Sequence, residues 1–209
     1  MNIDNIKKEF PIFDEKIQNN DLVYLDSANS SQKPKVVIDR ISEFYTKQFS
    51  NVGRSIHYLA VAATNLYETT RSSVKKYINA KDKNEIVFTK GATEALNLVA
   101  NTLGQKYLSE GDEILLSIME HHANIVPWYL LKKRNGIKLN WIELRQDGSL
   151  LADDIISKIG KKTKMIAITH MSNVLGSINE IKKICLAAKK LNVRVVVDGS
   201  QAAVHMPVN

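Results

Sequence analysis

Four short polar segments of the sequence carry side chains that could bind an anion, cover an aromatic ring or hold a cation. They are residues 90–94, 119–124, 170–176 and 198–202. Each follows directly after a run rich in β-branched or other apolar residues, which is typical of a strand. In an open parallel sheet, ligands bind beyond the carboxyl ends of the strands. We therefore expect these segments to lie at one edge of a sheet and to form one site.

The first of these segments offers the groups that bind a phosphate. It opens a predicted helix, so its first backbone amides point outward, and Gly91 permits close approach of the backbone. The hydroxyl of Thr93 could donate to the same anion. A threonine near a helix start is often a simple cap, and the residues alone leave both roles open.

The other three segments bring an imidazole, an amide and a carboxylate. The adjacent His121 and His122 point in different directions and cannot both bind one metal, so no metal site is expected there. A single ring at that place could cover a ligand or carry a proton. The polar loop at 170–176 could orient a ligand or only form a turn. Asp198 leaves a buried strand, so it either caps the next helix or faces a cationic group on a ligand.

Together these groups match the needs of pyridoxal 5'-phosphate. Its phosphate needs helix amides and hydroxyls, its ring needs a stacking partner, and its pyridine nitrogen needs a carboxylate to stay protonated. A protonated pyridine is the electron sink that stabilises a carbanion at the α-carbon of an amino acid. The strand-end residues therefore predict a site for this cofactor.

The elements that must position these groups alternate between strands and helices. Units of about 25–30 residues, a strand and then a helix, call for parallel pairing with right-handed crossovers. The sequence therefore predicts an α/β fold, with a mainly parallel sheet and helices on both faces. Strands are expected at 85–89, 113–117, 137–142, 163–169 and 194–198, and helices at 92–105, 125–133 and 151–159.

The N-terminal part of the chain has a different pattern. Helices are predicted at 35–49 and 59–78, after a short extended piece at 22–27. We therefore divide the chain into a helical N-terminal segment, residues 1–80, and an incomplete α/β cofactor-binding domain, residues 81–209.

One further helix is predicted near the end of the chain. The spacing of Ser177 and Glu180 is typical of a capping box, and apolar residues follow at helical intervals. Cys185 lies on that apolar stripe, where a small core side chain is expected rather than a reactive thiol.

Composition limits the class of protein. The 209 residues are 44% hydrophobic and 24% charged, which is typical of a globular chain and excludes intrinsic disorder. No apolar run is long enough for a bilayer, and the first ten residues carry acids where a signal peptide needs basic ones, so we expect a cytoplasmic protein without a membrane span. A single cysteine excludes an internal disulfide framework and a multi-cysteine zinc site. The net charge is +7, but the lysines are scattered or paired, which argues against a nucleic-acid partner.

Several segments resemble the class V aminotransferases, and most closely the SUF-type (group II) cysteine desulfurases. The stretch from Met119 to Trp128, which reads Met-Glu-His-His-Ala-Asn-Ile-Val-Pro-Trp, is highly specific. The resemblance covers essentially the whole chain. Its other motifs lie at 24–28, 32–34, 91–101, 169–176 and 197–202.

The resemblance implies fold type I of the pyridoxal-phosphate enzymes, a homodimer, and a transferase activity. That activity converts L-cysteine to L-alanine and passes the sulfur, as a persulfide, to an acceptor protein for iron–sulfur cluster assembly. It also implies roles for individual residues: phosphate binding by Thr93 and the Ala92 amide, ring stacking and proton transfer by His121, pairing with the ring nitrogen by Asp198, contact with the phenolic oxygen by Gln201, orientation of cofactor or substrate by Asn173, and approach to the substrate carboxylate by the Ala28 backbone.

The sequence departs from the family pattern in two ways. Near the expected active-site entrance it carries Asn29, Gly53 and Ser55 where the family has other residues. It also stops before the stretch that holds the family's Schiff-base lysine, nucleophilic cysteine and substrate-binding arginine, and Cys185 does not match the nucleophile. We therefore expect this polypeptide alone to be inactive, and expect a fragment, a split protein with a separate C-terminal half or a truncated product.

Other functions stay open at this point. Within the family, the alternatives are a selenocysteine lyase, a kynureninase or an aminotransferase. Outside it, the chain could be a non-catalytic remnant that acts as an interaction module. A nucleic-acid binder is the most distant alternative.

Overall fold

The computed structural model describes residues 3–208, and the chain divides into two compact units, Met1–Ile86 and Val87–Asn209. The first unit is mostly helical in its described part. Helix α3 begins after His57, whose side chain accepts from the Ala60 amide at 3.4 Å. The elements of this unit are α1 (Ile3–Lys7), η1 (Pro11–Asp14), β1 (Lys16–Ile17), β2 (Asn20–Asp21), α2 (Lys35–Glu43), the π-helical turn η2 (Phe44–Gln48), α3 (Tyr58–Tyr77) and η3 (Lys83–Glu85).

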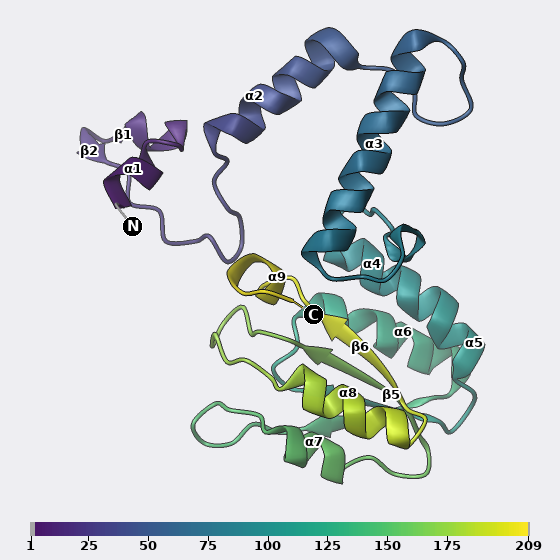
Figure 1. Cartoon of the computed structure of the whole chain (residues 1–209). Helices are drawn as coiled ribbons and strands as arrows, with labels where there is room; N and C mark the ends of the chain where they lie inside the picture. The colour runs from purple at the N-terminus through teal and green to yellow at the C-terminus, as the bar shows by residue number, and fades with distance from the viewer. Residues whose placement is uncertain (1–2, 209) are drawn as a thin grey trace. The chain divides into compact units, whose positions relative to one another are not determined.

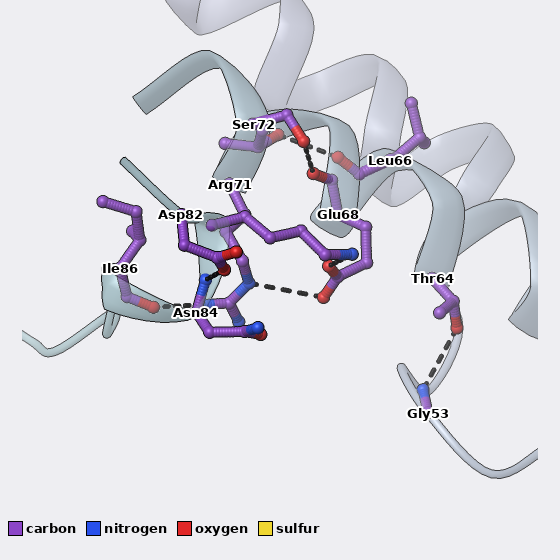
Figure 2. A network of polar contacts seen from close by, with 11 residues as sticks. Gly53, Thr64, Leu66, Glu68, Arg71, Ser72, Asp82, Asn84 and Ile86 are labelled. Atoms are coloured by element: carbon purple, nitrogen blue, oxygen red, sulfur yellow. Dashed lines mark hydrogen bonds and ion pairs between the residues drawn. The ribbon is translucent and has the colours of Figure 1, made fainter. Parts of the chain in front are cut away.

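Polar contacts bind the last residues of this unit to helix α3 (Figure 2). The Glu68 carboxylate accepts from Arg71 at 3.3 Å and from Lys83 at 3.1 Å. The Arg71 guanidinium also donates to the carbonyl of Ile86. With these contacts the first unit ends at Ile86. The sequence predicted the boundary six residues earlier, at residue 80.

The second unit has the α/β architecture that the sequence predicted. Its strands form a parallel sheet in the order β4-β3-β5-β6 among the described residues. Its elements are α4 (Ala92–Val99), the π-helical turn η4 (Ala100–Gly104), α5 (Gln105–Tyr107), β3 (Glu113–Ser117), η5 (His122–Asn124), α6 (Val126–Asn135), β4 (Lys138–Ile142), α7 (Ala152–Ser157), β5 (Thr163–Thr169), α8 (Ile181–Lys190), β6 (Arg194–Asp198) and α9 (Ala202–His205).

Helices cover both faces of this sheet, as Figure 1 shows for α6 on one side and for α7 and α8 on the other. Successive residues of a strand point to opposite faces, so neighbouring residues enter different cores. Leu115 and Ile166 pack with Ile155 of α7. Leu116 packs on the other face with Trp128 of α6. The prediction of a sheet buried on both sides is therefore confirmed.

Helix α6 shows how local sequence sets an element. Pro127 lies in its first turn, where a missing amide hydrogen removes no helical bond. Basic residues lie in its last turn, where their positive charges interact favourably with the negative end of the helix dipole. Gly136 ends it with φ of 68°, a left-handed conformation that glycine adopts without strain.

The predicted strand at 85–89 is wrong. Glu85 belongs to the 3-10 turn η3, whose cap Asp82 accepts from the Asn84 amide at 2.7 Å. No strand pairs with 85–89 among residues 3–208, and Val87 is 65% exposed. The run has the composition of a strand, but a strand also needs a neighbour to pair with, which local sequence does not supply.

Other predicted elements need smaller corrections. The helices expected at 35–49 and 92–105 form, but each contains a π-helical turn, η2 or η4. The capping box at Ser177 does not form. Helix α8 begins at Ile181 with Glu180 as its cap, and the Ser177 hydroxyl instead donates to the Gly148 carbonyl at 3.3 Å. A tertiary hydrogen bond has replaced the local one.

No helix among the described residues has the length and apolar character needed to cross a bilayer.

Candidate functional site

The carboxyl ends of β3, β5 and β6 meet at one edge of the sheet. The strand register places Thr169 opposite Asp198, and the His170 amide donates to the Asp198 carbonyl at 2.9 Å. Strand β3 pairs with the other side of β5 and ends at Ser117. Three of the four polar segments predicted to meet therefore follow adjacent strand ends.

The two carboxylate oxygens of Asp198 differ in their hydrogen bonding. The side chain is nearly buried, with 8% of the residue exposed. Its Oδ1 accepts from the Ser200 amide at 3.0 Å and from the Ser200 hydroxyl at 2.6 Å. No residue in the described part of the chain donates to Oδ2. One oxygen thus caps the following turn, while the other can accept from a ligand.

His121 opens the short turn η5 and exposes its ring. Its Nδ1 accepts from the Ala123 amide at 3.1 Å, and its carbonyl accepts from the Asn124 amide at 2.8 Å. A neutral ring that accepts at Nδ1 carries its proton on Nε2. The ring of His122 lies 6.1 Å away and nearly perpendicular, so the two imidazoles do not form one site.

A buried polar chain supports the His121 turn, and sequence reasoning missed it. The Trp128 indole donates to Asn124 Oδ1 at 3.1 Å, and Asn124 Nδ2 donates to the Glu120 carboxyl at 2.7 Å. The other Glu120 oxygen lies 2.5 Å from the Ser117 hydroxyl. These three residues lie on three different local structures, a coil, the turn η5 and helix α6, so no local pattern in the sequence links them.

The electrostatics of Glu120 follow from that burial. Burial raises the pKa of the Glu120 carboxyl, although hydrogen bonds from Ser117, Asn124 and the Thr169 backbone act in the opposite direction. The negative charge of Asp198 raises the same pKa further. The residue beside His121 is therefore electrostatically linked to Asp198.

The predicted phosphate-binding segment lies at the start of helix α4. Thr93 is exposed, and a side chain at Gly91 would meet no atom within 4 Å. The first amides of a helix have no partner inside it, and here Glu94 accepts only from the Lys90 amide before the helix, at 2.6 Å. Helix α4, which this segment opens, contacts η5, the turn that follows His121.

The loop after β5 carries Asn173 on its exposed part. Asn179 closes the loop, since its amide donates to the His170 carbonyl at 2.9 Å and its Nδ2 donates to the Thr169 carbonyl at 2.7 Å. The Oδ1 of Asn179 is buried without a hydrogen-bond partner. Ser172 Oγ accepts from the amide of Val174 at 3.2 Å. These hydrogen bonds fix the conformation of the loop, which places Asn173 at the same sheet edge.

The remaining predicted site residues lie in different places. Gln201 is half-buried and directly precedes α9. Ala28 belongs to the N-terminal unit, so its position does not test its predicted role. Cys185 lies half-buried on α8, where burial raises the pKa of its thiol, and it does not belong to the strand-end groups.

Two departures from the family pattern have local structural reasons. Asn29 closes the turn that contains Ala28, because its Nδ2 donates to the Asp26 carboxylate at 3.2 Å. Gly53 has φ of 108°, which glycine adopts more easily than other residues, and its amide donates to Thr64 Oγ1 at 3.1 Å (Figure 2). No contact in the described structure explains Ser55.

The donor set of this edge fits pyridoxal 5'-phosphate. A buried carboxylate with one uncommitted oxygen suits a protonated ring nitrogen. An exposed imidazole held by a backbone amide suits a ring face, and helix amides with the Thr93 hydroxyl suit a phosphate.

Comparisons with known proteins agree on one family. The family model described as aminotransferase class V matches residues 23–209. A probable cysteine desulfurase of Halalkalibacterium halodurans is 44% identical over 209 residues, which are 100% of this chain and 52% of that protein. The chain thus spans about half the length of the curated relatives it matches.

Solved structures show the same fold. The apo structure of a cysteine desulfurase from Thermococcus onnurineus NA1 superposes with a TM-score of 0.91 at 38% identity, covering 100% of this chain and 50% of that one. A C-DES mutant with glycine covalently linked to its PLP cofactor superposes with a TM-score of 0.75, covering 97% of this chain and 51% of that one. Its identity is 23%, so that likeness concerns the fold alone.

Proposed function

Because this chain belongs to the class V aminotransferase family, we propose that it forms the cofactor-binding part of a cysteine desulfurase. The proposed reaction converts L-cysteine to L-alanine and transfers the sulfur, as a persulfide, to an acceptor protein. The observation that carries the proposal is the Asp198 carboxylate, which is buried at the sheet edge and keeps one oxygen uncommitted. The curated relatives named cysteine desulfurase support the choice of reaction.

In this proposal the cofactor is pyridoxal 5'-phosphate, which supplies an electron sink for a carbanion at the substrate α-carbon when it is bound. Asp198 accepts a hydrogen bond from the ring nitrogen and keeps that nitrogen protonated. His121 covers one face of the ring, and its Nε2 can exchange a proton with the substrate. The Ala92 amide and the Thr93 hydroxyl hold the phosphate.

The proposal includes further residues and partners. Gln201 contacts the phenolic oxygen, Asn173 orients cofactor or substrate, and the Ala28 backbone approaches the substrate carboxylate. A homodimer, or a separate chain carrying the other half of the family's length, completes the site. The products serve iron–sulfur cluster assembly. We place the protein in the cytoplasm, because persulfide transfer needs thiol acceptors that are kept reduced.

A chimera tests this function. Residues 1–209 are joined to the part of the Halalkalibacterium halodurans relative that the chain does not match, and alanine formation from L-cysteine is measured with added pyridoxal 5'-phosphate. We expect alanine from the chimera and none from the 209 residues alone, whose single cysteine is on α8.

Variants of the chimera assign the activity to the site. Asp198→Ala removes the partner of the ring nitrogen, so the rate should fall about a hundredfold. The control is Asp153→Ala, which removes an exposed aspartate paired with Lys183 at 2.8 Å and should leave the rate nearly unchanged. A folded chimera that forms no alanine, or that tolerates Asp198→Ala, would refute the proposal.

A further inference from the structure

The excess positive charge of the chain comes from one stretch of its sequence. Of the 29 basic and 22 acidic residues, nine basic residues and a single acid, Glu180, lie within residues 155–197. The net charge of the remainder is close to zero. The stretch covers the end of α7, all of β5 and α8 and most of β6, which contact one another. Lysines that look scattered in the sequence therefore belong to neighbouring elements.

Helix α8 carries part of this charge around an exposed leucine. Ile184 and Ala188 are fully buried in the core. Leu186 is two residues from each of them, so it lies roughly 160–200° around the helix, on the opposite face, where it is 57% exposed. Lys182 and Lys190 lie four residues before and after it, on the same side of the helix. Packing of the core does not account for this leucine.

The exposed leucine lines a groove beside α8. The groove has a volume of about 720 Å³ and includes Ile156 of α7, the helix that packs against α8 (Figure 1). Leu186, Ala187 and Leu191 of the α8 segment complete its apolar lining. Leu191 is more than half exposed as well. The groove therefore offers apolar surface that no described residue covers.

The same groove has an excess of positive charge. Lys182, Lys183 and Lys190 line it, together with one acid, Glu180. Lys183 pairs with Asp153 at 2.8 Å, whereas Lys182 and Lys190 form no ion pair among residues 3–208. An apolar surface bordered by cations is complementary to an apolar side chain flanked by carboxylates.

The spacing of the lysines defines what a partner must present. Lys182 and Lys190 are separated by about 12 Å along the helix axis, with Leu186 midway. A partner helix with acids four residues before and after an apolar residue has the same spacing. Residues 155–197 contain no Phe, Tyr or Trp, so they offer no aromatic platform for the bases of a nucleic acid. The groove therefore favours a protein helix over a nucleic acid.

We propose that the groove between α7 and α8 binds an acidic amphipathic helix of a partner protein. Leu186 contacts the apolar face of that helix, and Lys182 and Lys190 pair with its carboxylates. The proposal uses no residue that the proposed function assigns to the cofactor or the substrate, so each of the two can fail without the other.

A synthetic peptide tests this surface on the 209-residue chain. The peptide is alanine-rich, about 20 residues long, and carries one leucine with a glutamate four residues before and after it. It is added to the ¹⁵N-labelled chain. We expect amide shifts at residues 182–191 and at Ile156, and a Kd that rises with salt concentration. No shifts, shifts confined to other helices, or the same shifts with lysines in place of the two glutamates would overturn the proposal.

Leu186→Ala tests the apolar contact. Alanine keeps the helix and removes the side chain that the peptide should cover, so the Kd should rise about tenfold. The matched control is Leu130→Ala, which truncates a 47% exposed leucine of α6 and should leave the Kd unchanged. An equal Kd for Leu186→Ala and the unmodified chain would contradict binding in the groove.

Lys190→Glu tests the charge contact. Lys190 and the control Lys132 both lie in the last turn of a helix, and Lys132→Glu changes the net charge by the same amount. Lys190→Glu should raise the Kd of the peptide about fivefold to tenfold, and Lys132→Glu should not. Equal effects would mean that the peptide responds only to net charge.

A DNA duplex of about 20 base pairs is titrated in parallel. We expect it to bind more weakly than the acidic peptide, because both the phosphates and the bases lack a counterpart for the exposed leucines. A duplex that binds more tightly than the peptide, with an affinity that Lys190→Glu lowers and Leu186→Ala does not change, would assign this surface to a nucleic acid and refute the proposal.

Discussion

Asp198 serves the fold with one oxygen and leaves the other for a ligand. The Ser200 amide and hydroxyl both donate to Oδ1 and close the turn after β6. The sequence predicted either a cap of the next helix or a ligand partner; Asp198 closes the turn at Ser200 and does not cap α9, whose cap is Gln201, and the ligand role stays a prediction. A carboxylate already held in place loses little conformational entropy when it binds a cation.

The raised pKa of Glu120 gives stability a definite dependence on pH. The ordinary pKa of a glutamate side chain is 4.5, and burial raises the pKa of Glu120 in the folded state above it. Below pH 4.5 both states hold the proton, and as pH rises the unfolded chain releases it first. The free energy of unfolding should therefore fall with rising pH until the folded-state pKa is passed, by at most about 1.4 kcal/mol per pH unit.

Urea unfolding of the unmodified chain and of Glu120→Gln, at a series of pH values that begins below 4.5 and extends upward from it, measures this effect. The glutamine variant has no proton to lose at this position. The unmodified chain should therefore lose stability relative to Glu120→Gln as pH rises. A constant difference between the two proteins across that range would mean that the Glu120 pKa is the same in both states.

At the scale of elements, the alternation of strands and helices predicted most of the second unit. Parallel order follows from strand–helix units, and the carboxyl ends of the strands then meet at one edge, which is why Asp198 and the His121 turn could be grouped from sequence. Features set by tertiary partners could not be predicted in this way. The run at 85–89 lacks a neighbouring strand, and Ser177 bonds to Gly148 instead of capping α8. Glu120 escaped notice because nothing local shows that it is buried.

The packing of η4 against α6 gives a test at this scale. A methyl group at Gly104 would lie 2.7 Å from Leu131 Cδ2, and Leu131 is fully buried. Overpacking of this kind costs about 1–3 kcal/mol, and alanine returns up to about 1 kcal/mol of helix propensity. Gly104→Ala should therefore lower the free energy of unfolding by about 1–2 kcal/mol in urea denaturation.

Gly91→Ala is the matched control for that substitution. The new methyl group would meet no atom within 4 Å, and the φ of 165° is extended backbone that alanine adopts. Its free energy of unfolding should stay within about 0.5 kcal/mol of the unmodified chain. Equal effects of the two substitutions would show that the contact with Leu131 does not control packing at η4.

At the scale of the molecule, the chain matches about half the length of its relatives. This half contains the sheet edge whose side chains fit the cofactor. Strand β6 is the last strand of the described sheet, and its valines are only partly buried. A further strand beside β6 would cover them and satisfy its free backbone groups. The proposed function accordingly assigns the remaining catalytic groups to a second chain or chain segment.

The most direct test of the central claim is a map of where pyridoxal 5'-phosphate binds. Amide ¹H–¹⁵N spectra of the 209-residue chain are recorded with and without the cofactor. We expect the largest shifts at Ala92 and Thr93, at residues 120–122 and at residues 198–201. Shifts confined to the N-terminal unit or to α7 and α8, or no shifts at saturating cofactor, would contradict a site at the carboxyl edge of the sheet.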